Sequence, residues 1–359
     1  MPASKSAFDH VLDETVGQGR YQYISYFFIG LVAMADEAEM MTMSVTLSTL
    51  SKQFNLDNDE QTLLTTMLFV GMFIGSIFAG PFADRFGRRL TLIIATLLET
   101  IIGAGSAFLP NFTSFVVMRT LLGVMIGFTN PIAVTYTTEI STTEYRGKSQ
   151  VLIQFFFVIG ALYSSGVAKI FLGSFGEGNW QMVLVFSAVP SLISFLGLIF
   201  YCVESPRFYI ASSKYDQGIE MLNKMKHKNK HDNLRDIAEG DKGALIDWKE
   251  KTFDPKYQSS FSSLFIKGNL KNTINLSIIW FGLNFIFYGL IIVAPKVFEQ
   301  VHGKDGQGLN DFIFTLLGEP LAIVIAILVI DRKGFARRNT TLYSLLLGGL
   351  FYFSVFSVG

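Results

Sequence analysis

The chain has 359 residues, of which 50% are hydrophobic and only 16% are charged, and its formal net charge is zero. A soluble domain carries about a quarter charged residues, so this composition indicates that lipid surrounds much of the chain. The neutral charge gives no indication of a nucleic-acid-binding protein, and the single cysteine, Cys202, excludes an intramolecular disulfide.

Residues 1–20 form the first predicted region, a cytoplasmic segment. It contains Asp9, Asp13 and Glu14 and lacks an apolar run, so it is not a cleavable signal peptide. We therefore expect the first membrane-spanning helix itself to direct insertion.

Long apolar runs follow along the rest of the chain. A membrane-spanning helix needs about 20 mostly apolar residues. Such runs cover residues 21–49, 62–83, 90–109, 114–139, 150–172, 181–203, 273–296, 311–330 and the stretch from 340. The first six form a predicted N-terminal half, residues 21–203. The others belong to a C-terminal half, residues 271–359, which is expected to stop after about three helices.

A hydrophilic segment, residues 204–270, separates the two predicted halves. Within it Ile219, Leu222 and Met225 share one helical face, which is typical of a short amphipathic helix lying at the membrane interface. The polar stretch over residues 227–251 receives no predicted structure. His227 and His231 lie four apart there, a spacing that suits a metal, but a solvated charged face is the better interpretation.

The short loops indicate the orientation of the chain. With the N-terminus inside, the inner loops contain Arg85, Arg88, Arg89, Arg146, Lys148, Arg332, Lys333, Arg337 and Arg338. The outer loops then contain only Lys52, Lys296 and Lys304. Because basic residues concentrate in cytoplasmic loops, the N-terminus and the long loop are predicted to be cytoplasmic.

The strongest local motif joins the second and third apolar runs. It contains, in order, Gly80, Asp84, Arg85, Gly87, Arg88 and Arg89. Gly80 allows the helix to end close to a neighbour, Asp84 is placed to cap an adjacent helix, and Gly87 supplies a tight turn. An ordinary basic loop is the alternative, but six such positions at fixed spacing make it the weaker interpretation.

This loop resembles the signature of the major facilitator superfamily. A weaker copy, which begins with Asp331 and Arg332 and ends with Arg337 and Arg338, follows six helices later. The resemblance implies two homologous six-helix halves. In the family the loop around Asp84 docks against a helix near the C-terminus, which is not expected in this chain. The chain is therefore expected to be a fragment or a natural truncation.

Further motifs resemble the sugar and organic-ion porter branch. They are Arg119-x-x-x-Gly123-x-x-x-Gly127, the pair Glu139 and Arg146-Gly147, and Glu204-Ser-Pro-Arg207-Phe. The runs GQGRYQY and MADEAEMMTMS are most similar to synaptic-vesicle-2-related proteins. The resemblance implies a cytoplasmic gate in which Glu139 and Arg146 act with the loop charges, pairing across the two halves when the carrier faces outward. Ordinary surface charges are the alternative.

Charged residues inside the apolar runs predict a second site. An ionisable residue in a spanning helix costs several kcal/mol, so it normally faces a cavity or a partner. Asp36 and Glu39 lie on one face of the first run, and Arg119 is placed at a similar depth in the fourth. We expect Arg119 to pair with Asp36 or Glu39, and protonation of a carboxylate to break that pair during transport. A permanent structural ion pair is an equal alternative.

Two other acidic residues lie within apolar runs. Glu99 occupies the middle of the third, and Glu319 directly precedes Pro320 in the eighth. Either side chain could line a cavity, and Glu319 could instead satisfy backbone groups freed by the proline or lie at a kink. We include Glu319 with Asp36, Glu39 and Arg119 among the candidates for solute and proton coupling.

The sequence thus predicts an all-α, multi-pass carrier of the major facilitator fold in the plasma membrane or an intracellular vesicle. Its expected partners are a small organic ion or sugar-like solute and the bilayer, and it is expected to be monomeric. Neither a P-loop nor a nucleophile or metal motif is present, so we expect no enzymatic activity, metal or cofactor. The alternative is a non-transporting membrane or vesicle protein with a binding or regulatory role.

Overall fold

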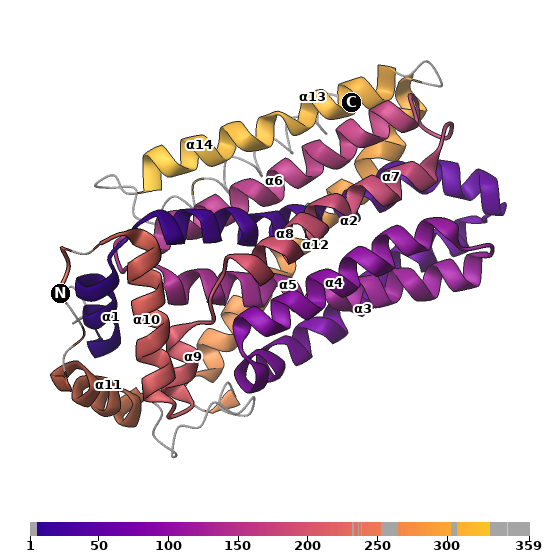
Figure 1. Ribbon diagram of the computed structural model, residues 1–359. Helices are drawn as coiled ribbons and strands as arrows, with labels where there is room; N and C mark the ends of the chain where they lie inside the picture. Colours follow the sequence, from indigo (N-terminus) through magenta and orange to yellow (C-terminus); the bar gives the residue numbers. More distant parts are fainter. Residues whose placement is uncertain are drawn as a thin grey trace. The chain divides into compact units, whose positions relative to one another are not determined.

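The computed structural model describes residues 6–231, 233–235, 237, 239–252, 265–266, 268–302, 307–330 and 343. All of the regular elements in these ranges are helical, which confirms the predicted all-α fold (Figure 1). The chain divides into two compact units, one up to Ile313 and one from Phe314. In the second unit, the described helix is α14 (Gly318–Ile330).

The first unit contains the membrane helices of the predicted N-terminal half. They are α2 (Arg20–Phe54), α3 (Asn58–Phe86), α4 (Arg88–Gly105), α5 (Phe112–Ile140), α6 (Arg146–Phe171), α7 (Trp180–Ser187) and α8 (Val189–Phe200). They are followed by α12 (Leu270–His302) and by α13 (Gln307–Leu316), which crosses the unit boundary.

Among the described residues, seven helical segments are long and apolar enough to cross a membrane. They are Asn58–Phe86, Arg88–Phe108, Phe112–Ile140, Arg146–Phe171, Trp180–Phe200, Leu270–Val301 and Gln307–Ile325. Helix α2 is not among them although it is 35 residues long, because its apolar run is interrupted by Asp36, Glu37 and Glu39. The ninth predicted span, from residue 340, lies outside the described residues except for Tyr343.

Proline explains two breaks in spans that the sequence predicts as continuous. Helix α7 ends at Ser187, and Pro190 occupies the first turn of α8. Helix α13 ends at Leu316, and Pro320 lies in the first turn of α14. Proline has no backbone N–H to donate to the preceding turn, so it is favoured at the start of a helix and disrupts its interior.

Glycines bring α3 and α5 together along their length. A Cβ on Gly71 or Gly75 would lie 2.1 Å from a backbone carbonyl oxygen of α5. A Cβ on Gly123 or Gly127 would lie 2.1 and 2.2 Å from carbonyl oxygens of α3. Small residues spaced four apart allow helices to approach backbone to backbone, so Gly123 and Gly127 of the fourth-span motif are packing positions.

Helix α2 lies at the centre of the first unit, in contact with α5, α6, α7 and α8 (Figure 1). Most of its residues are buried. It packs closely against α6 at two glycines. Gly30 of α2 faces the Phe156 ring, and Gly160 of α6 faces the Met34 carbonyl. The helix ends at Phe54, and the capping residue Asn55 has a φ of 52°, the left-handed conformation common at helix C-termini.

Short helices from both polar segments pack together where α2 begins. They are α1 (Ala7–Val11), the π-turn at Leu12–Val16, α9 (Pro206–Ala211), α10 (Tyr215–Asn229) and α11 (Glu239–Thr252). The prediction that α10 rests its apolar face on the membrane is wrong. Leu222 and Met225 are fully buried in the same cluster as Phe8 and Leu12. Helix α11 lies in the stretch for which the sequence predicted no structure.

Candidate functional site

The central feature of the first unit is a buried ion pair. Arg119 of α5 is 0% exposed and Glu39 of α2 is 1% exposed. The Arg119 Nη1 atom donates to Glu39 Oε2 at 2.8 Å, and Nη2 donates to Ser106 Oγ at 2.9 Å. The guanidinium also lies 5.2 Å from the centre of the Phe115 ring. The sequence left two partners open for Arg119, and in the structure the partner is Glu39.

Asp36, the other predicted partner, lies one turn away on α2 and pairs with a hydroxyl instead. Thr129 of α5 donates to Asp36 Oδ1 at 2.7 Å. Asp36 is 1% exposed, and its Oδ2 has no hydrogen-bond partner among the described residues. Asp36 is therefore held by α5 but is not neutralised by Arg119.

Glu99 adds a further carboxyl group to this buried cluster. It lies on α4, is 1% exposed, and neither oxygen has a hydrogen-bond partner in the described part of the chain. One turn later on α4, a Cβ on Gly103 would lie 2.5 Å from Glu39 Oε1. Gly103 is thus the position at which α4 admits the Glu39 side chain.

The balance of charge determines what the cluster can do chemically. Asp36, Glu39 and Glu99 provide three carboxyl groups for one guanidinium, and all are buried. An unpaired carboxylate in the membrane interior costs several kcal/mol, so a carboxyl group without a partner there takes up a proton instead. The arrangement is therefore suited to bind and release protons.

The far end of α2 contacts α12, the helix that follows the long polar loop. Ser44 donates to the Ile291 carbonyl at 2.6 Å, and Lys296 donates to Gln61 of α3 at 3.0 Å. The Ser48 hydroxyl donates to Glu299. A cavity of only about 10 Å³ remains between α2, α3 and α12 beside Ser44. These helices are therefore closed against one another at this end.

At the opposite end, Glu204 caps the N-terminus of α4. Gly87 there has a φ of 97°, a conformation that favours glycine. The Glu204 carboxylate accepts from the backbone N–H groups of Arg88 and Arg89 at 2.9 and 3.0 Å. The tight turn predicted at Gly87 is present. The prediction that Asp84 caps the neighbouring helix is wrong, because Glu204 occupies that place.

The loop arginines bind different partners within the N-terminal half. Arg88 forms ion pairs with Glu139 of α5 at 3.2 Å and with Asp84 at 2.8 Å. The Arg89 guanidinium donates to the carbonyls of Leu198 and Ile199 at 2.9 and 2.8 Å, so it satisfies the C-terminal end of α8. These contacts join α3, α4, α5 and α8 at one end.

The N-terminal segment supplies a partner for two of the motif arginines. Asp9 of α1 forms ion pairs with Arg146 and, at 3.2 Å, with Arg207. The Arg207 guanidinium also lies over the rings of Phe8, at 4.9 Å, and Trp248, at 5.5 Å. Burial raises the pKa of Asp9, but hydrogen bonds and charge from Arg146 and Arg207 outweigh it and hold the net pKa below the usual 3.8.

The family is decided by comparison with known proteins. The model of the family described as "Sugar (and other) transporter" matches residues 20–358. This chain belongs to that family. It is thus a multi-pass membrane protein related to transporters rather than to enzymes.

Individual relatives of this sugar-transporter-family chain agree with the predicted branch. Human synaptic vesicle glycoprotein 2B is 26% identical over 330 residues, which cover 83% of this chain and 48% of that protein. The synaptic vesicle 2-related protein of Bos taurus is 29% identical over 341 residues, 89% of this chain and 59% of that one. The chain therefore spans about half to three fifths of the length of these relatives.

Solved structures of other members confirm the major facilitator fold. The proton:xylose symporter XylE, bound to a bromo-deoxyglucose, matches with a TM-score of 0.72 at 22% identity, over 88% of this chain and 70% of that one. A partially occluded inward-open structure of XylE from E. coli matches with a TM-score of 0.69, over 88% and 74% of the two chains.

Several predicted site residues belong neither to the buried cluster around Arg119 nor to the ion pairs of Arg88 and Arg146 at the opposite end. No atom of the described residues lies within 4 Å of a Cβ placed on Gly80, so the expected close contact is wrong for this part of the chain. Arg85 stacks on the neighbouring Phe86 ring at 5.4 Å, and Gly147 lies in the first turn of α6. Glu319, half-buried on α14, belongs to the second unit. Asp331 and Arg332 lie outside the described residues.

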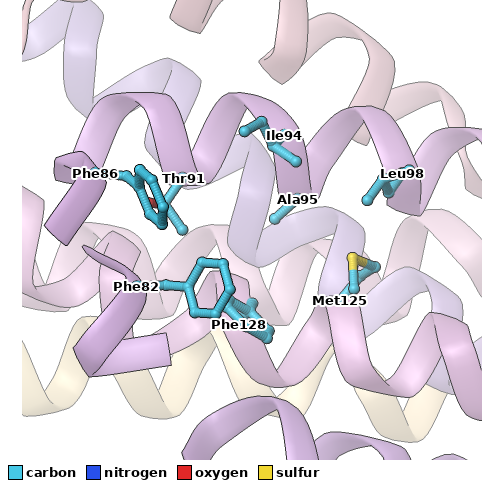
Figure 2. A pocket seen from close by; sticks show the side chains of 8 residues that line it. All are labelled: Phe82, Phe86, Thr91, Ile94, Ala95, Leu98, Met125 and Phe128. Atoms are coloured by element: carbon cyan, nitrogen blue, oxygen red, sulfur yellow. The ribbon is translucent and has the colours of Figure 1, made fainter. Parts of the chain in front are cut away.

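A separate pocket of about 330 Å³ lies between α3, α4 and α5 (Figure 2). Its lining consists of Phe82, Phe86, Thr91, Ile94, Ala95, Leu98, Met125 and Phe128. The single hydroxyl in that lining, on Thr91, donates to the Gly87 carbonyl of its own helix. The pocket therefore suits an apolar occupant.

Two of these contacts are not evident from the sequence. Asp9 lies in a polar N-terminal segment, far along the chain from Arg146 and Arg207, its ion-pair partners. Glu204 is recognisable through its motif, but its role as a helix cap depends on the long-range return of the chain to α4.

Proposed function

We propose that this chain acts as a secondary carrier that moves small organic ions or sugar-like solutes by alternating access, coupled to protons. The observation that supports this most directly is the buried Arg119–Glu39 pair with Asp36 beside it, on helices α5 and α2. A pair that is broken when one carboxyl group takes up a proton links proton binding to helix movement.

The proposed motion rocks a half formed by residues 21–203 against a half that begins near residue 271. Contacts between α2 and α12 at Ser44 and Ser48 form the gate that must open on one side. On the other side, the ion pairs of Arg88 with Glu139 and of Arg146 with Asp9 form the second gate. We place that side, with the N-terminus, in the cytoplasm, and we propose that the carrier works as a monomer.

The test is uptake into proteoliposomes that contain the full 359-residue chain. Radiolabelled D-xylose, D-glucose and tetraethylammonium serve as probes, with and without an imposed pH gradient. We expect uptake of at least one probe that rises when the gradient drives protons with the solute. Glu39→Gln should abolish the effect of the gradient, whereas Glu144→Gln, at an exposed loop position, should retain it.

A membrane protein with a binding or regulatory role is the second candidate. The names of two relatives favour it, because they refer to synaptic vesicles and not to a transported solute. Absence of uptake for every probe, in vesicles where the chain is folded, would support this candidate and contradict the carrier proposal.

A further inference from the structure

Glu99 is the buried acidic residue that the proposed pair does not use. Its carboxyl group is 1% exposed, and both oxygens lack hydrogen-bond partners among the described residues. By contrast, Glu39 accepts from Arg119 and Asp36 accepts from Thr129. A carboxyl group with no donor in a buried site is more stable with a proton than without one.

The charged groups around Glu99 come from two other helices. Asp36 and Glu39 of α2 are close enough to act on it electrostatically, and both carry negative charge when ionised. Arg119 of α5 is bound to Glu39 and to Ser106, which lies two turns beyond Glu99 along the chain. Helices α7 and α8, which pack against α4, contain no Asp, Glu, Lys, Arg or His. Helix α3, which also packs against α4, has its charged residues only in its first and last turns. Arg119, the cation of the buried cluster, is already paired with Glu39.

The geometry also provides a route by which Glu99 and Glu39 can exchange roles. Gly103 lies one turn after Glu99, and its missing side chain leaves room for Glu39 Oε1 directly against α4. That oxygen has no hydrogen-bond partner in the described structure. Glu39 therefore presents a free oxygen to the helix that carries Glu99.

We propose that Glu99 holds a proton in this state and that Glu39 is the group with which it exchanges that proton. The proton leaves the Glu99 carboxyl and binds the Glu39 carboxylate, so the total charge is unchanged. Glu99, now ionised, then replaces Glu39 as the partner of Arg119. This inference rests on the proposed proton-coupled transport and adds a second carboxyl group to it.

Infrared spectroscopy of the full chain in lipid nanodiscs tests the protonation without any solute. We expect a C=O stretch of a protonated carboxyl group at neutral pH that shifts when glutamate is labelled with ¹³C at the side-chain carboxyl. Glu99→Gln should remove the band, and Glu144→Gln, at a solvated site, should leave it. The labelled wild-type chain shows whether the protonated group is a glutamate even if a variant does not fold.

Three outcomes would overturn the proposal: no such band in the wild-type chain, a band unaffected by the glutamate label, or a band that persists in Glu99→Gln. A band lost in Asp36→Asn instead would place the proton on Asp36. None of these readings requires transport, so failure here is distinct from failure of the uptake assay.

A double-substitution cycle tests the exchange of partners. Glu39→Gln should lower the melting temperature only slightly, because Glu99 can ionise and pair with Arg119. Glu99→Gln should also have a small effect, because glutamine resembles the neutral acid. In the double variant Arg119 loses both carboxylates, so the loss in melting temperature should exceed the sum of the two single losses. Additive losses would contradict the exchange.

Discussion

Gly87 and Glu204 fit together so closely that a Cβ on the glycine would lie 2.4 Å from the Glu204 Oε2 atom. The turn between α3 and α4 is therefore built around a carboxylate that arrives from the loop after α8. The glycine supplies both the space for this carboxylate and the positive φ of 97°.

Gly87→Ala should destabilise the protein by about 1–3 kcal/mol, because the new methyl group meets Glu204 and the backbone is strained at positive φ. Thermal unfolding in detergent, followed by tryptophan fluorescence, measures the effect. Gly80→Ala is the matched control, since a Cβ placed there has no atom of the described structure within 4 Å. Equal melting temperatures for the two variants would contradict the proposed fit.

Glu204→Ala should cost about 1–2 kcal/mol through the loss of charged acceptors at the N-terminus of α4. The exposed Asp84 carboxylate, which the sequence predicted as the cap, serves as the control, and Asp84→Ala should cost about 0–1 kcal/mol. Hydrogen exchange of the first amides of α4 provides the local readout. Faster exchange in the Asp84 variant than in the Glu204 variant would reverse this assignment.

Arg119→Ala should destabilise the protein by about 3–5 kcal/mol, because it leaves Glu39 buried without a cation. Replacing Glu39 as well, in Glu39→Gln/Arg119→Gln, should recover part of that loss, since no buried charge is then left unpaired. Melting temperatures of the purified chains decide the matter. A double variant that is less stable than Arg119→Ala would show that the ion pair is not the source of the effect.

Gly123→Leu should prevent α3 and α5 from packing, because its side chain would collide with the Leu68 carbonyl. We expect loss of the monodisperse peak in size-exclusion chromatography. Gly166→Leu, at a position where an added Cβ meets no atom of the described residues within 4 Å, should retain that peak. The contact is unimportant if both variants elute like the wild-type chain.

The ion pairs of Asp9 should stabilise the short helices that pack around α1 at neutral pH and lose that effect in acid. The pKa of Asp9 is lowered from 3.8 in the folded state, so its contribution is complete above the unfolded value. It declines as pH falls through the lower folded value. Asp9→Asn should therefore lower the melting temperature at pH 7 and have little effect at the most acid pH tested. If the melting temperature of Asp9→Asn lay below that of the wild-type chain by the same amount at every pH, the charge of Asp9 would not be the cause.

The sequence predicts most of the described membrane helices, because an apolar run of sufficient length identifies each of them. It also predicts α2, although charged residues interrupt the apolar run of that helix. It also predicted that Arg119 pairs with an acid of α2, since a cation buried there has few other partners. It could not decide between Asp36 and Glu39, because both share one helical face and the choice depends on where Thr129 and Gly103 lie on other helices.

The polar segments were predicted poorly for a related physical reason. The apolar face of α10 has the same pattern whether it covers protein or lipid. Its burial against Phe8 and Leu12 follows from the return of the chain to its own N-terminus. The capping role of Glu204 and the partners of Asp9 likewise depend on distant segments, which no local spacing reveals.

The backbone contact between α3 and α5 limits how the molecule can move. At four glycines the two helices touch through carbonyl oxygens, with no intervening layer of side chains that could rearrange. Sliding one helix past the other by a single residue would push a bulky side chain into the opposing backbone. These two helices must therefore move as one rigid unit. Any bending during a transport cycle has to occur in other helices, whose contacts are made by side chains that can change rotamer.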